Sequence, residues 1–240
     1  MPVQMRIMLL GPPGVGKSVY AGRIARSIGI PHISTGDLLR SQMKALDSNS
    51  DSVSLLRPDE KTEVARTMES GSLVPSEIVS RLLRRRLELE DCVRGYLLDG
   101  FPRTVEQARS FAGLDAVLHM IQYPDIIIEK LGGRRVCPTP GCATPNYNIV
   151  HVHRHGIDMP PMPPQVPGTC DTCKSKLIKR PDDDSSTVKK RLQLYESDTL
   201  PLVELYRARG ILVDVAVAGA VHHWIPAAWH ILGNSSKTSI

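Results

Sequence analysis

The chain has 240 residues, of which 41% are hydrophobic, so it is long enough for one substantial α/β domain with insertions. Its formal net charge of +5 suits a small polyanionic ligand but is too diffuse to indicate a nucleic-acid-binding protein. No apolar stretch approaches the roughly 18 residues of a membrane span, and a predicted strand begins within about five residues of the N-terminus, which leaves no room for a cleavable signal. We therefore expect a cytoplasmic protein without a membrane or nucleic-acid partner, with an organelle as the alternative location.

A glycine-rich turn lies between a predicted strand over residues 5–10 and a predicted helix over residues 19–26. The turn reads Gly11-Pro12-Pro13-Gly14-Val15-Gly16-Lys17-Ser18, which matches the pattern G-x-x-x-x-G-K-[ST]. Its glycines let backbone N–H groups approach phosphate oxygens, and the helix N-terminus adds partial positive charge. Lys17 is expected to reach the outer phosphates, and Ser18 offers a hydroxyl to Mg²⁺. The turn therefore predicts that the chain binds a nucleoside triphosphate.

Downstream of this turn, predicted strands alternate with predicted helices. Strands are predicted over residues 29–34, 96–99, 117–121 and 211–215, and helices from residue 35, over 59–69, over 75–90 and over 187–209. The polar residues 47–51 are expected to form a flexible surface insertion. The alternation predicts an α/β fold with a parallel sheet covered by helices on both faces, and with ligands at the C-terminal ends of the strands.

The segment from about residue 131 to 178 interrupts the alternation, and its length predicts a small folded insertion rather than a loop. It contains two close cysteine pairs, Cys137 with Cys142 and Cys170 with Cys173. Four thiolates suit a structural, tetrahedral Zn²⁺ ion, although reduced thiols and a disulfide remain alternatives. The alternating residues His151, His153 and His155 share one face of a predicted strand, and we expect a solvent-facing hairpin there rather than further ligands.

Several longer motifs, taken in chain order, resemble the adenylate kinase family, in its variety with a long lid. They are the phosphate loop, residues 30–37 (IPHISTGD), 71–75 (GSLVP), 97–104 (LLDGFPRT), 133–136 (GRRV), Arg180-x-Asp182-Asp183 and residues 190–192 (KRL). The resemblance covers nearly the whole chain. It implies a P-loop nucleoside monophosphate kinase fold with a five-stranded parallel sheet. The implied core comprises residues 1–33, 75–130 and 184–240, the monophosphate-binding arm residues 34–74, and the lid residues 131–183.

The resemblance also implies a reaction, the reversible Mg²⁺-dependent phosphoryl transfer ATP + AMP = 2 ADP, and residues that carry it. The implied catalytic residues are Lys17, Arg103, Arg134, Arg180 and Arg191. The implied ATP-binding residues are Gly11, Gly14, Val15, Gly16, Lys17, Ser18, Val19, Arg134, Tyr147 and Val217. The implied AMP-binding residues are Thr35, Arg40, Ser72, Leu73, Val74, Gly100, Phe101, Pro102, Arg103, Gln107, Arg180 and Arg191. Ser18 and, through water, Asp99 are the implied ligands of Mg²⁺.

The sequence departs from the family pattern at a few positions and leaves other functions open. Ser18-Val19 replaces the usual Gly-Thr, Lys130 replaces a common arginine, and residues 46–60 lengthen the monophosphate-binding arm. A kinase of UMP or CMP, or an AMP kinase that uses GTP, remains an alternative. A nucleotide-gated binding module is the alternative from another class, although the lid lacks the aromatic and basic stripe of a nucleic-acid surface. We expect ATP, AMP and ADP as partners, and a monomer.

Overall fold

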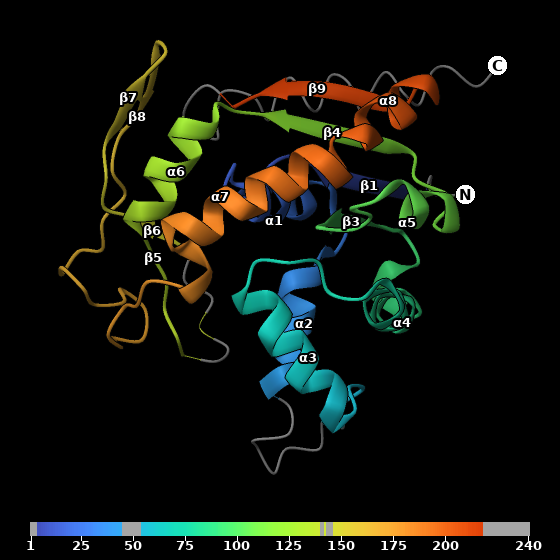
Figure 1. Cartoon of the computed structure of the whole chain (residues 1–240), viewed down its shortest axis with the longest axis horizontal. Coiled ribbons are helices and arrows are strands. Elements are labelled where there is room, and N and C mark those ends of the chain that lie inside the picture. Colours follow the sequence, from blue (N-terminus) through green and yellow to red (C-terminus); the bar gives the residue numbers. More distant parts are fainter. Residues whose placement is uncertain (1–3, 45–53, 140–141, 143–145, 218–240) are drawn as a thin grey trace.

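A five-stranded parallel sheet, in the order β2-β3-β1-β4-β9, forms the centre of the molecule (Figure 1). The structure, a computed structural model, describes residues 4–44, 54–139, 142 and 146–217, so the predicted insertion over 47–51 lies outside the described residues. The strands are β1 (Met5–Leu10), β2 (His32–Ser34), β3 (Gly95–Asp99), β4 (Ala116–Ile121) and β9 (Leu212–Ala216). The apolar runs of β1 and β3 are buried on both faces, as central parallel strands require.

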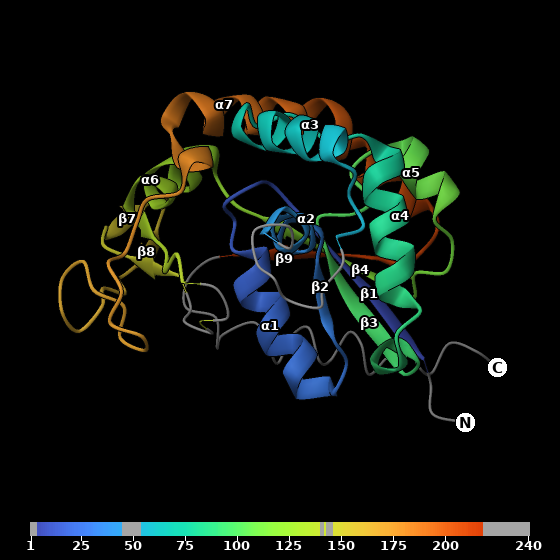
Figure 2. The same ribbon diagram turned by 90° about the horizontal axis from the view of Figure 1, so that it is seen from below.

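Helices cover the two faces of this sheet, as predicted. The helices of the described residues are α1 (Lys17–Ile28), α2 (Thr35–Lys44), α3 (Pro58–Glu69), α4 (Ser76–Leu87), α5 (Val105–Ser110), α6 (Pro124–Gly133), α7 (Ser185–Leu194) and α8 (Pro201–Ala208). Alternate residues of β1 face opposite sides: Ile7 and Leu9 pack against α1, whereas Met8 and Leu10 pack against α5 and α8. Figure 2 shows α1 and α5 on opposite sides of the sheet. Among the described residues, no helix is long and apolar enough to span a membrane.

Two predicted elements differ from the observed ones. The strand expected over residues 29–34 begins at His32, because the N–H groups of Gly29 and Ile30 still bond to the carbonyl of Ala25 and close α1. The helix expected over residues 187–209 is interrupted by a π-helical turn at Tyr195–Thr199. Pro201 has no N–H to continue the α-helical ladder, and the preceding turn widens so that Leu200 N bonds to the carbonyl of Tyr195 at 2.7 Å.

The insertion after α6 is folded, as its length predicted, but it contains little regular structure. Two short antiparallel pairs join β5 (Arg134–Arg135) to β6 (Tyr147–Asn148) and β7 (Val152–Arg154) to β8 (Ile157–Met159). The β7–β8 hairpin packs on α6, and a separate small cluster of apolar residues surrounds the cysteines. A 3₁₀ turn at Pro181–Asp183 then leads into α7.

Candidate active site

Two adjoining cavities lie at the C-terminal ends of β1, β2 and β3. The larger has a volume of about 430 Å³ and is bounded by the phosphate loop on one side and by residues of the insertion on the other. The smaller, of about 90 Å³, lies between α2, the segment around Leu73 and the Phe101 ring. Arg40, Arg103 and Arg191 line both cavities, so positive charge is concentrated where the two spaces meet.

The predicted binding residues divide between these cavities. Of the ten residues predicted to bind ATP, eight line the larger cavity: Gly11, Gly14, Gly16, Lys17, Ser18, Val19, Arg134 and Tyr147. Each residue predicted to bind AMP lines at least one of the two cavities. Val15 and Val217 are buried and line neither. The carbonyl of Val217 accepts a hydrogen bond from Gln122 Nε2 at 2.5 Å, so this carbonyl already has a donor within the protein.

The phosphate loop curls around the Lys17 side chain. Lys17 Nζ donates to the carbonyls of Gly11 at 2.8 Å and Pro12 at 2.9 Å. Gly14 and Gly16 have φ angles of 80° and 111°, and a Cβ at Gly14 would come within 2.6 Å of Leu131 Cδ1. Burial, together with the nearby charges of Arg103 and Arg191, lowers the pKa of Lys17 to about 8 against the opposing effect of Asp99. An anion in the larger cavity would favour the charged form of this lysine.

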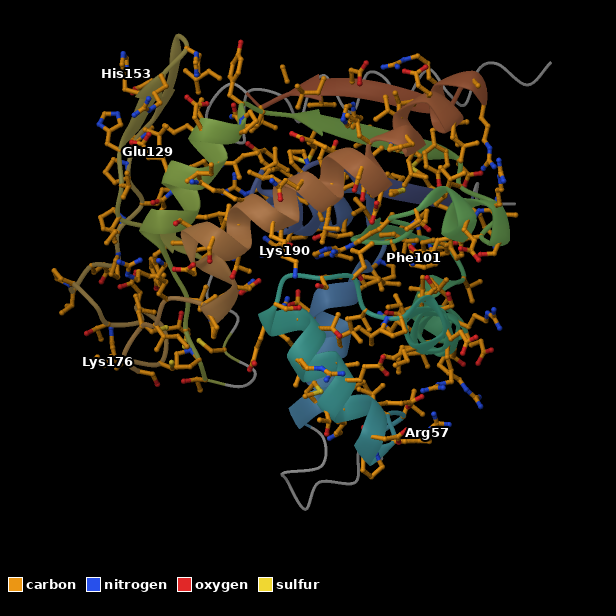
Figure 3. All side chains as sticks on the ribbon, viewed as in Figure 1. Arg57, Phe101, Glu129, His153, Lys176 and Lys190 are labelled. Carbon is orange, nitrogen blue, oxygen red and sulfur yellow. The ribbon has the colours of Figure 1, made fainter. Side chains whose placement is uncertain are left out.

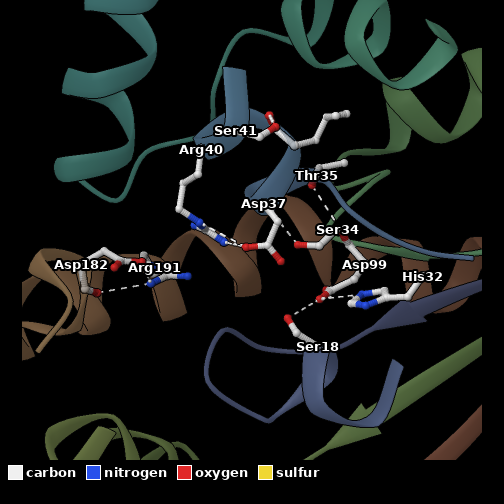
Figure 4. A network of polar contacts seen from close by, with 11 residues as sticks. Ser18, His32, Ser34, Thr35, Asp37, Arg40, Ser41, Asp99, Asp182 and Arg191 are labelled. Atoms are coloured by element: carbon white, nitrogen blue, oxygen red, sulfur yellow. Dashed lines mark hydrogen bonds and ion pairs between the residues drawn. The ribbon is translucent and has the colours of Figure 1, made fainter. Parts of the chain in front are cut away.

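The carboxylate of Asp99 at the end of β3 connects the phosphate loop to β2 (Figure 4). Its Oδ2 accepts a hydrogen bond of 2.6 Å from the Ser18 hydroxyl and lies 3.8 Å from His32 Nε2. Burial alone would raise the pKa of Asp99, but His32, Lys17 and the Ser18 hydroxyl outweigh it and lower the pKa below its usual range. The pair of Ser18 and Asp99 therefore places a hydroxyl and an ionised carboxylate together, which are oxygen donors of the kind that Mg²⁺ prefers.

Buried arginines give the site its positive charge. Burial lowers the pKa of Arg103, of Arg191 and of Arg180, the last to about 10. Mutual repulsion adds to the effect, since Arg191 acts on Arg103 and Arg134 acts on Arg180. Crowded cations of this kind are stabilised by a multiply charged anion, and their planar forks match phosphate oxygens.

Carboxylates hold several of these arginines in place. Asp183, which is buried, accepts a bidentate pair of hydrogen bonds from Arg134 Nε and Nη2. Asp182 Oδ2 accepts from Arg191 Nη1 at 2.8 Å, and both residues are labelled in Figure 4. The orienting role of Asp182 and Asp183 was not predicted, although both lie within a motif that the sequence analysis identified. The available signal was charge complementarity, because carboxylates form strong hydrogen bonds with arginine side chains.

The smaller cavity is bounded by groups that can recognise a base. Gln107 Oε1 accepts from the Arg103 backbone N–H at 2.8 Å, and Gln107 Nε2 donates to the Ser76 hydroxyl at 2.8 Å. Thr35 Oγ1 donates to the carbonyl of Asp99 at 3.2 Å. The carboxamide of Gln107 is thereby fixed in orientation, and its oxygen retains a free lone pair for a further donor.

The four cysteines of the insertion form one cluster, with all four sulfur atoms within 4.8 Å of one another. Cys137 Sγ lies 3.4 Å from Cys173 Sγ, and Cys142 Sγ lies 3.7 Å from Cys170 Sγ. Sulfurs at the corners of a tetrahedron with Zn–S bonds of 2.3 Å would be about 3.8 Å apart. The structure thus brings together the four residues that the sequence predicted, in an arrangement close to a zinc tetrahedron.

Comparison with known proteins agrees with this geometry. The family model described as "Adenylate kinase" matches residues 9–211. A protein named adenylate kinase from Caldanaerobacter subterraneus subsp. tengcongensis is 39% identical over 223 residues, covering 88% of each chain. Another from Moorella thermoacetica is 39% identical, with 95% of this chain and 98% of the relative covered. A third, from Streptomyces avermitilis, is 36% identical over 226 residues, with 90% and 92% covered.

Proposed function

The chain belongs to the adenylate kinase family, and on this premise we propose how its residues divide the work of reversible phosphoryl transfer, ATP + AMP = 2 ADP. It is a nucleoside monophosphate kinase, a phosphotransferase. The observation that supports the proposal is that the two cavities meet at Arg40, Arg103 and Arg191. An acceptor phosphate and a donor phosphate placed at this junction share the same cations, which in-line transfer requires.

On the donor side, the phosphate loop holds the triphosphate of ATP in the larger cavity. The backbone N–H groups of the loop bind the phosphate oxygens, and Lys17 exchanges its bonds to the Gly11 and Pro12 carbonyls for bonds to the outer phosphates. Mg²⁺ accompanies ATP and neutralises phosphate charge when bound. The hydroxyl of Ser18 and the Asp99 carboxylate, 2.6 Å apart, fit that ion, with Asp99 acting through water.

On the acceptor side, Arg40 and Arg103 hold the phosphate of AMP, while Gln107 and Thr35 face its base in the smaller cavity. A free lone pair on Gln107 Oε1 can accept a hydrogen bond from the amino group of adenine, a group that uracil lacks. The shared arginines then stabilise the charge that develops on the transferring phosphoryl group. Arg134 and Arg191 are oriented for this role by Asp183 and Asp182.

The insertion, residues 131–183, serves in this proposal as the lid that excludes water from the larger cavity. Water must be excluded because it would otherwise accept the phosphoryl group. Tyr147 and Met162 line the cavity opposite the phosphate loop, and the bridge between Asn148 and Met162 (N···O 2.7 and 3.1 Å) holds them together. The two cavities form a complete site within one chain, and we propose that the enzyme acts as a monomer.

We further propose that the cysteine cluster binds one structural Zn²⁺. Four thiolates complete the tetrahedral coordination and leave no open position, so the ion would stabilise the lid and take no part in the transfer. A hydrogen bond with the Ser175 hydroxyl (3.4 Å) contributes most to lowering the pKa of Cys173, which favours its metal-binding thiolate form, whereas the pKa of its neighbour Cys137 is raised.

A panel of monophosphates with ATP as donor tests the acceptor assignment. We expect AMP to be preferred over CMP and UMP by at least about tenfold in kcat/KM, the ratio that a few base-edge contacts supply. Diphosphate formation is the measurement. If CMP or UMP were preferred, the assignment of Gln107 and Thr35 to adenine recognition would be wrong, while the arginine roles would stand.

A further inference from the structure

The β7–β8 hairpin carries a second group of metal-ligating side chains, apart from the cysteines and from the active site. His151 immediately precedes β7, His153 lies within it, and Asp158 lies in β8. The antiparallel register places His153 directly opposite Asp158. Since side chains alternate along a strand with a period of two, His151 lies on the same face as this pair.

The three side chains converge on a single atom. Asp158 Oδ1 accepts from His151 Nε2 at 2.7 Å and from His153 Nδ1 at 3.1 Å. All three remain open to solvent, with 55%, 76% and 59% of the side chains of His151, His153 and Asp158 exposed. These side chains form a potential N₂O ligand set, with two imidazole nitrogens beside one carboxylate oxygen, and all three are accessible from solvent.

The opposite face of the hairpin fixes its position on α6. Val152 and Ile157 are buried against Ile126, and Arg154 Nε donates to Glu129 Oε2 at 2.7 Å. Figure 3 shows His153 at the outer edge of the molecule, beside the hairpin. The contacts with α6 therefore hold the strand pair in position. A metal ion bound on the outer face would leave these contacts intact.

His155 does not belong to this group, although the sequence predicted that it would share the face of the other two histidines. It lies in the turn of the hairpin with a φ angle of 53°, which breaks the alternation. Its ring stacks on Tyr123 with 4.2 Å between ring centroids, and its Nε2 lies 2.8 Å from Asp125 Oδ2. It therefore provides a matched control on the same hairpin.

We propose that His151, His153 and Asp158 bind one transition-metal dication of the class that prefers imidazole, namely Ni²⁺, Cu²⁺ or Zn²⁺. Mg²⁺ and Ca²⁺ are disfavoured because they take oxygen ligands. On binding, each neutral imidazole presents its lone pair to the metal and keeps its proton on the other ring nitrogen. Asp158 supplies the negative charge, since its hydrogen bonds to the two histidines lower its pKa. Waters complete the coordination.

Metal binding at this site requires the two histidine rings to rotate. In the cysteine cluster all four ligand atoms already lie within 4.8 Å of one another, whereas the two imidazoles meet through the carboxylate between them. Metal–nitrogen and metal–oxygen bonds of about 2.0–2.2 Å need the rings to rotate toward each other. Exposed side chains make such rotations within nanoseconds, so this step is no barrier to binding.

Calorimetric titration of the untagged full chain with Ni²⁺ tests the proposal. The protein is first given one equivalent of Zn²⁺ and desalted, so that the cysteines are occupied. We expect about one Ni²⁺ per chain, without the near-ultraviolet charge-transfer absorption of nickel bound to thiolate. His151→Gln and His153→Gln should each lower the affinity at least about tenfold, since even outer partners of metal ligands contribute that much. His155→Gln should leave the affinity unchanged.

Three results would overturn the proposal: no binding of Ni²⁺ by the wild-type chain, equal affinity in the His151 and His153 variants, or a thiolate absorption band that accompanies the binding heat. Thermal melting of each variant in the absence of nickel confirms that it is folded. As a second readout, Ni²⁺ should slow amide hydrogen exchange in residues 151–159 of the wild-type chain and leave that of the His153→Gln variant unchanged, because the ion joins β7 to β8.

Discussion

The sheet core and the predicted lid, residues 131–183, are held together by different interactions. Around α1, β1 and β4, one cluster contains Ile7, Leu9, Leu118 and eleven other buried residues. Among its described residues, the two clusters of the predicted lid contain three buried residues each, and one of these six, Ile126, belongs to α6. Hydrophobic burial therefore stabilises the core over a large area, whereas the predicted lid has two small apolar clusters, one of them against α6, and polar contacts such as that between Arg154 and Glu129.

This difference suits the chemistry. In the proposed mechanism the core holds the phosphate loop and Arg103 in fixed positions, because transfer depends on alignment. A lid with little apolar burial can unfold or move at a low free-energy cost without loosening the sheet. The comparison therefore predicts which substitutions should lower catalytic activity, which should lower global stability and which should affect only the stability of the lid.

The largest effect is expected from the arginine at the junction of the two cavities. Arg103→Lys keeps the positive charge but loses the planar fork, so kcat/KM should fall about 10²-fold, equivalent to about 2.7 kcal/mol of transition-state stabilisation. Its melting temperature should stay near that of the wild type. Steady-state kinetics with AMP and ATP measure the effect. Wild-type kinetics in the lysine variant would remove Arg103 from the site.

Two matched truncations compare the core with the lid. Leu118→Ala removes a fully buried side chain of β4 and should lower the global free energy of unfolding by about 2–5 kcal/mol. Leu177→Ala removes a buried side chain of the lid and should lower the global value by less than about 1 kcal/mol, because the lid opens below the global transition. Urea denaturation measures both. Equal losses would mean that the core and lid unfold as one unit.

A smaller effect is expected in the uptake of protons when ATP binds near the phosphate loop. The pKa values of Lys17 and Lys130 are lowered by burial to about 8 in the ligand-free protein, so each is partly deprotonated at pH 8. Phosphates raise these values, and ATP binding at pH 8 should take up protons. Lys17→Met should reduce the uptake by about half, since two similar groups contribute. Calorimetry of ATP binding in buffers of different ionisation enthalpy measures the number of protons taken up. Proton release on ATP binding would contradict this account.

The pH dependence of the stability of the ligand-free protein should also reflect the lowered pKa of Lys17. Because its folded pKa lies below its unfolded one, the folded state binds fewer protons between about pH 8 and 10.5. Stability from Lys17 therefore rises with pH through this window, and the cost of its burial is fully present below about pH 8. The Lys17→Met variant should show a flatter profile over the same range.

Local patterns were enough to predict most of the sheet and the phosphate loop. The run of apolar residues in β1 and the glycines that follow determine their structure within a few residues of chain, so periodicity and turn chemistry suffice. The interruption before Pro201 was missed because a helical pattern does not show how the backbone accommodates a proline.

The relations between distant residues were harder to predict. Asp183 lies 49 positions from the arginine that it orients, and only the fold brings the two together. The bond between Gln122 and the Val217 carbonyl likewise joins residues 95 positions apart. His155 left the expected face because a turn residue with positive φ does not follow strand alternation. The domain boundaries and the roles of the individual site residues stay predictions.

Hydrogen exchange of Cys142→Ser beside the wild-type chain tests the central comparison most directly. The substitution leaves three of the four sulfurs, and the account predicts loss of the bound zinc with faster exchange around Cys170 and Leu177, since structural zinc contributes directly to folding. Amides of β1, β3 and β4 should keep their wild-type protection. Loss of protection in the core strands to the same degree as in the lid, or no change in the lid, would contradict it.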